Sequence, residues 1–128
     1  MILPLLVFAD WALLALRLTV AFIFLAHGWP KLKNLKTNAE NFAMMGFKPG
    51  WLWGTIVALV ENVGSVLLIL GVGTQVVGVL MAGEIMVAAF WKKKQGMGLV
   101  NGYELDILLA AAALVLATMG GGALALWF

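Results

Sequence analysis

Cysteine is absent from the chain, which excludes disulfide bonds, thiolate metal sites and a thiol nucleophile. Histidine occurs once, at His27, so haem ligation by two histidines of one chain is excluded. The carboxylates are scattered without the spacing of metal ligands, and no glycine-rich segment has the strand and lysine of a phosphate-binding loop. Nothing in the sequence supports nucleic-acid binding. We therefore expect no metal, no covalently bound cofactor and little independent catalysis by the isolated chain.

Charge is also scarce, and apolar residues take its place. Only 11% of the 128 residues are charged and 64% are hydrophobic, whereas soluble domains are nearer a quarter charged and half apolar. This composition is typical of an integral membrane protein, with one domain over residues 1–128. Apolar segments long enough for spanning helices cover about 11–29, 52–70, 75–91 and 103–119. The sequence predicts an all-α fold: a transmembrane antiparallel four-helix bundle.

The lysines predict how this bundle is oriented. All seven fall in two loops on one side of the four expected spans, at 30–50 and 92–102. The positive-inside rule then places both loops in the cytoplasm and both termini outside, in the plasma membrane. Tryptophans near the span ends fit the aromatic belts of a bilayer.

The polar segment over residues 30–50 follows a predicted helix end at Pro30, because a proline disfavours helix at the preceding residue. Thr37 and Glu40 have the spacing of a capping box, and Gly46 suits a helix end. The segment is amphipathic enough for the membrane surface, and a covered loop is an equal alternative. The conformations of residues 1–10 and 120–128 stay open.

Glu61 stands at the centre of the second span, at a depth where a charged group is costly unless it faces protein or water. Gly54, Ala58, Glu61 and Ser65 recur at helical intervals and share one face. Small residues on a membrane helix mark the side on which another helix approaches. Glu61 is therefore expected to point into the bundle.

Two further ionisable residues are expected near the same depth. Glu84 is close to the middle of the third span, and Arg17 is about one turn outward of the middle of the first. Two carboxyl groups with one cation need not both be ionised, so the cluster is a candidate proton or ligand site. The alternatives are a purely structural Arg17–Glu61 pair, and a Glu84 that faces a second copy of the protein.

A second polar layer is expected near the cytoplasmic boundary, from His27, Lys31, Glu104 and Asp106. Glu104 and Asp106 are two residues apart on a helix and diverge, so only one is expected to turn inward. Either could accept a hydrogen bond from His27. A hydrogen-bonded helix end is the simpler role for this histidine, and a proton shuttle is the alternative.

Four short motifs follow one another along most of the chain. They are Arg17-Leu18 with Leu25-Ala26-His27-Gly28 and Lys31; Phe42-Ala43-x-x-Gly46; Glu61-Asn62-Val63-Gly64 with Leu67-Leu68-Ile69-Leu70-Gly71 and Thr74; and Asn101-Gly102-Tyr103-Glu104-Leu105. Together they resemble the DoxX family of small four-helix membrane proteins. Gly120-Gly121-Gly122 and the apolar tail depart from the family's Gly-Pro-Gly turn and polar tail, and Glu84 has no family counterpart.

The resemblance implies a membrane subunit of a redox-linked assembly, with other redox subunits or further copies of the chain as partners and a quinone as the expected cofactor. Arg17, His27, Glu61 and Glu104 are then candidates for polar contacts to the quinone head group or for proton exchange. A non-enzymatic scaffold or assembly factor is a second hypothesis. A proton-coupled exporter is a third, although the small multidrug exporters carry their key glutamate in the first span.

Overall fold

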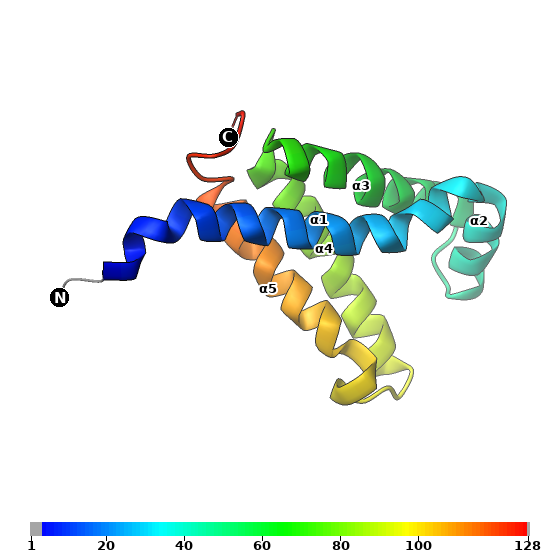
Figure 1. The fold of residues 1–128 in the computed structure, drawn as a ribbon. Coiled ribbons are helices and arrows are strands. Elements are labelled where there is room, and N and C mark those ends of the chain that lie inside the picture. The colour runs from blue at the N-terminus through cyan, green and yellow to red at the C-terminus, as the bar shows by residue number, and fades with distance from the viewer. Residues whose placement is uncertain (1–3, 128) are drawn as a thin grey trace.

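The computed structural model describes residues 4–127, and residues 1–3 and 128 of the predicted domain lie outside the described residues. The described chain is entirely helical apart from its turns and its C-terminal tail (Figure 1). Its elements are, in order, η1 (Pro4–Phe8), α1 (Ala9–Lys33), α2 (Leu35–Met44), α3 (Gly50–Leu70), α4 (Thr74–Lys94), η2 (Leu99–Tyr103) and α5 (Glu104–Met119). The all-α prediction is therefore confirmed for these residues.

Four stretches of helix are long and apolar enough to cross a membrane: Pro4–Lys33, Gly50–Leu70, Thr74–Lys94 and Leu99–Met119. Each contains one of the four spans expected from hydropathy. Most of their large apolar side chains point away from the protein, as lipid-facing side chains do. The chain is thus a multi-pass membrane protein by length and composition.

The predicted end of the first helix at Pro30 is wrong, because α1 continues through this proline to Lys33. A proline inside a helix removes one backbone hydrogen bond, so packing must compensate. Gly28 lies so close to α3 that a Cβ there would collide with Glu61 Cβ. The last turns of α1 are therefore held against α3, and Lys31 belongs to a helix rather than to a loop.

The segment after α1 folds into α2, which packs on the first turns of α3. Asn34, rather than Thr37, caps this helix, since its side chain accepts a hydrogen bond from Thr37 N. Asn38 is buried and donates to Gly54 O at 2.8 Å. The polar segment is therefore a covered helix on its α3 side.

The helices associate as two pairs, which cross in Figure 1. α1 packs mainly on α3, and α4 packs mainly on α5. The tight turn at 71–73 joins the pairs, and Gly71 has a left-handed backbone with φ of 74°. A shared apolar core fills the space between them, with Phe24 from α1, Leu68 from α3, Met81 from α4 and Leu116 from α5 fully buried.

Two glycines of α4 contribute very differently to this packing. A Cβ at Gly78 would lie 2.7 Å from Ala117 N and 2.8 Å from Ala113 O, so this glycine allows the backbones of α4 and α5 to touch. A Cβ at Gly83 would meet nothing within 4 Å. Gly78 therefore belongs to the contact between α4 and α5, and Gly83 does not.

Gly78→Ala is expected to destabilise the protein by roughly 1–3 kcal/mol, because the new methyl group collides with backbone that cannot move aside. Gly83→Ala is the matched control and should be neutral or stabilising by up to about 1 kcal/mol, since alanine favours helix. Thermal unfolding of the purified variants in one detergent measures both. Equal melting temperatures for the two would contradict this account of the α4–α5 contact.

Candidate functional site

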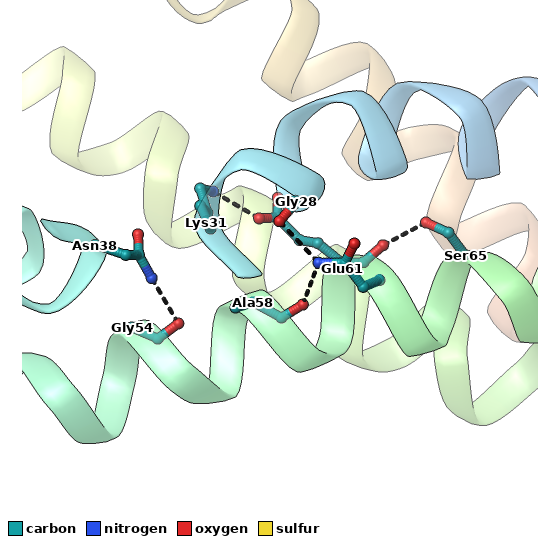
Figure 2. A network of polar contacts seen from close by, with 8 residues as sticks. Gly28, Lys31, Asn38, Gly54, Ala58, Glu61 and Ser65 are labelled. Atoms are coloured by element: carbon teal, nitrogen blue, oxygen red, sulfur yellow. Dashed lines mark hydrogen bonds and ion pairs between the residues drawn. The ribbon is translucent and has the colours of Figure 1, made fainter. Parts of the chain in front are cut away.

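The polar face of α3 lies inside the protein, as its small-residue spacing predicts. Gly54, Ala58, Glu61 and Ser65 are all buried. Ser65 Oγ donates to the backbone carbonyl of Glu61, so the serine satisfies its hydroxyl within its own helix (Figure 2). This leaves the Glu61 carboxylate as the group on this face that needs a partner from another helix.

That partner is Lys31. Its Nζ lies 2.6 Å from Glu61 Oε1, and Figure 2 shows the two side chains meeting between α1 and α3. The Glu61 side chain is 3% exposed and the Lys31 side chain 31% exposed. The acid is thus fully inside the protein, whereas the ammonium group can be approached from outside.

Asn62, the next residue along α3, fixes the two helices against each other. Its Nδ2 donates to Gly28 O at 2.8 Å on α1 and to Ala58 O at 2.7 Å on its own helix. Gly28 is also in close contact with Glu61, so both Glu61 and Asn62 of α3 pack against this glycine. This contact sets the position from which Lys31, one turn further along α1, reaches Glu61.

Glu84 of α4 completes the cluster. Its carboxyl group is near enough to Glu61 and Lys31 to interact electrostatically with both. Its Oε1 is buried and has no hydrogen-bond partner. One ammonium and two carboxyl groups therefore come together from three helices.

The expected contact between Arg17 and Glu61 does not form. Arg17 is 1% exposed, and its guanidinium donates instead to Leu68 O at 2.9 Å and to Leu124 O at 3.2 Å. Leu68 is seven residues beyond Glu61, about 10 Å further along α3. Arg17 therefore stabilises the carboxyl end of α3, where a positive charge is favourable, and lies outside the glutamate cluster.

The expected inner layer is also arranged differently. Asp106 turns inward and pairs with Lys92, with 2.8 Å between Nζ and Oδ2, while Glu104 is exposed and accepts from Asn101 N at 3.4 Å. The prediction that only one of these acids turns inward is confirmed. His27 is exposed on α1, and neither acid bonds it within the described chain. The expected His27 hydrogen bond is wrong.

Sequence reasoning missed Lys31 as the partner of Glu61 and gave no role to Asn62. The available signal was the spacing of Gly28 and Lys31 by three residues, which puts both on one face if the helix passes Pro30. The presence of an amide directly beside the buried acid was a second signal. The spacing signal was overlooked because α1 was expected to end at Pro30, and the amide was given no partner on that helix.

Comparisons with known proteins agree with this picture. A protein of Bacillus subtilis (strain 168) named "Putative oxidoreductase CatD" is 32% identical over 113 residues, covering 88% of this chain and 82% of that protein. A protein of Haemophilus influenzae described as uncharacterized is 30% identical over 124 residues, covering 93% of this chain and 90% of that protein. No solved structure matches the chain. The DoxX family model matches residues 12–94, which include all three residues of the Lys31–Glu61–Glu84 cluster, and the chain therefore belongs to the DoxX family.

Proposed function

We propose that the chain is an integral membrane subunit of a redox-linked assembly and that it binds the head group of a quinone at the Lys31–Glu61–Glu84 cluster. In this proposal all four long helices cross the plasma membrane in alternating directions, with the lysine-rich loops in the cytoplasm and both termini outside. The N-terminal ends of α1 and α3 then lie on opposite sides of the bilayer.

The observation that carries the proposal is a partly accessible cation paired with a buried acid inside apolar helices. Lys31 Nζ has donors free for an incoming carbonyl oxygen, since an ammonium group has three and Glu61 takes one. In this proposal the neighbouring carboxyl groups of Glu61 and Glu84 exchange a proton with the bound molecule. A charged group at this depth is costly, and such groups in membrane helices mark ligand or proton pathways.

The redox chemistry itself would come from the bound quinone and from another subunit. The sequence has no cysteine and one histidine, so the chain's own part is to bind, orient and exchange protons. The name of the Bacillus subtilis relative supports a link to an oxidoreductase. Apolar side chains around the cluster would exclude water from the head group.

Protein purified in a mild detergent is expected to retain close to one quinone per chain, measured by extraction and ultraviolet absorbance. Glu61→Gln should lower the retained quinone by about tenfold, the cost of losing a hydrogen bond to a charged group. Glu104→Gln is the matched control, because that acid is exposed and bonds only its own loop. Wild-type protein that carries no quinone and binds none on addition would exclude the proposal.

A scaffold or assembly role is the second candidate, and the hydrogen bonds between helices favour it. Asn62 and Asn38 each donate one hydrogen bond to a backbone carbonyl of a packed helix. Arg17 donates two, to Leu68 O and Leu124 O. Interhelical contacts of this kind hold a bundle in one arrangement. Under this reading Lys31–Glu61 is a further clamp between α1 and α3.

Lys31→Met tests the clamp, because it leaves the Glu61 carboxyl buried without its cation. We expect a loss of roughly 1–3 kcal/mol, less than for a fully buried pair since Lys31 is about one-third exposed. Adding Glu61→Gln should recover part of this loss, because the uncompensated charge is removed. Thermal unfolding in detergent measures the effect, with exposed Lys33→Met as the control.

Unchanged stability in Lys31→Met, relative to Lys33→Met, would contradict the structural importance of the pair. The quinone content separates the two candidate functions. A destabilised variant together with quinone in the wild type supports the quinone site, whereas a destabilised variant with no quinone in the wild type leaves the scaffold.

A further inference from the structure

His27 is a polar side chain on the outside of a spanning helix. It is exposed on α1, and no hydrogen bond or ion pair joins it to another residue in the described part of the chain. Its depth follows from the next residue, because Gly28 accepts a hydrogen bond from Asn62 and packs against Glu61. Glu61 is one residue past the middle of the 21-residue helix α3, so His27 lies at the depth of the acyl chains.

An exposed histidine at this depth needs a partner from outside the chain. Its imidazole carries a donor and an acceptor of hydrogen bonds, and acyl chains can satisfy neither. Ionisable side chains in membrane helices therefore almost always face protein or water rather than lipid. The position of His27 indicates that this side of α1 is covered by another molecule in the membrane.

The same side of α1 also offers an unused acceptor. Pro30 has no N–H, so the carbonyl oxygen of Ala26, four residues earlier, lacks the hydrogen bond that a helix normally gives it. Ala26 and Pro30 are both exposed. Adjacent residues of a helix differ by only about 1.5 Å in height, so this acceptor and the imidazole of His27 start from nearly the same depth.

An open hollow on α1 has room for a side chain next to this acceptor. This α1 hollow is lined by Phe22, Leu25, Ala26, Trp29 and Pro30. With 3.6 residues per turn, Leu25 and Trp29 lie on one flank of the Ala26 side of the helix, and His27 lies on the other flank. The histidine therefore cannot fill the hollow of its own helix.

Small residues allow a second helix to approach this side of α1. Ala12, Thr19 and Ala26 follow at intervals of seven residues, so they share one side of the helix, and all three are exposed. The hydroxyl of Thr19 donates to Ala15 O at 2.8 Å within α1, so it needs no further partner. Small side chains in a membrane helix favour close contact with another helix.

We propose that two copies of the chain associate through this side of α1, about a twofold axis normal to the membrane. Such an axis brings equivalent residues to the same depth, and it sets the His27 flank of one copy against the opposite flank of the other. Each imidazole then lies in the α1 hollow of the other copy, where its N–H donates to Ala26 O.

A second copy fits this surface because the surface carries both the donor and its acceptor at one depth. Two identical surfaces therefore satisfy both unpaired groups in each copy, through two equivalent hydrogen bonds. The interface lies on the side of α1 that faces away from α3, whereas the Lys31–Glu61–Glu84 cluster lies between α1, α3 and α4. The association does not depend on the proposed quinone function.

The chain has no cysteine, so one introduced cysteine reports the contact without ambiguity. Ala26→Cys keeps the backbone carbonyl and places a thiol at the centre of the interface. Val63→Cys is the matched control, because Val63 is exposed on α3 one residue beyond Asn62 and so lies near the same depth. Membranes of cells that express each full-length variant are oxidised with copper phenanthroline, and the products are identified by mass.

Ala26→Cys is expected to give a product of twice the chain mass in about tenfold higher yield than Val63→Cys, because a disulfide forms only where the two Cα atoms come within about 7 Å. Equal yields from the two variants would overturn the proposal. A product that joins Ala26→Cys to a different protein would overturn it as well, since another subunit would then occupy this side of α1.

The role of His27 is measured separately, by energy transfer between copies labelled with dyes at Val63→Cys in liposomes. His27→Leu is expected to raise the dissociation constant of the dimer about tenfold, the effect of two lost hydrogen bonds between membrane helices. Thr19→Val is the control on the same side of α1 and should leave the constant unchanged, because its hydroxyl bonds only its own helix. The same dissociation constant for both variants would contradict the proposed contact of His27 with Ala26 O.

Discussion

A carboxylate at the middle of a membrane helix needs a polar partner or water within the protein, because lipid offers no hydrogen-bond partner. In this chain the partner of Glu61 is Lys31, and their contact requires a particular arrangement of α1 and α3. α1 has to remain helical past Pro30, and Gly28 has to be without a side chain so that α1 and α3 touch. Asn62 then holds the two helices at the level where the ion pair closes.

Polar contacts recur at three levels of the molecule, and each joins segments that are distant in sequence. Arg17 connects α1 with the end of α3 and with the C-terminal tail. The Lys31–Glu61–Glu84 cluster connects α1, α3 and α4, and Asp106 connects α5 with α4 through Lys92. Apolar packing alone selects partners weakly in lipid, because the acyl chains are as apolar as the side chains. These contacts therefore specify which helices pair.

Much of the fold could be predicted from the sequence, because membrane helices follow from apolar length and the buried face of α3 follows from small residues around Glu61. The site was only partly predictable. Counting residues along the spans predicted that Arg17 lies near Glu61. In the structure Arg17 instead donates to carbonyl oxygens of the tail and of the end of α3, which the sequence does not reveal. The general rule that helices end near a proline placed Lys31 outside the predicted helix. In the structure, close packing at Gly28 outweighs the single hydrogen bond lost at Pro30.

The central claim is that Lys31, and not Arg17, neutralises the acid of α3. Solid-state NMR on protein in lipid bilayers can measure the dipolar coupling between the side-chain nitrogen of each cation and the carboxyl carbon of Glu61. The account predicts a separation below about 4 Å for Lys31 Nζ, the range of an ion pair, and no detectable coupling for the Arg17 guanidinium. A strong coupling of Glu61 to Arg17, or to neither cation, would contradict it.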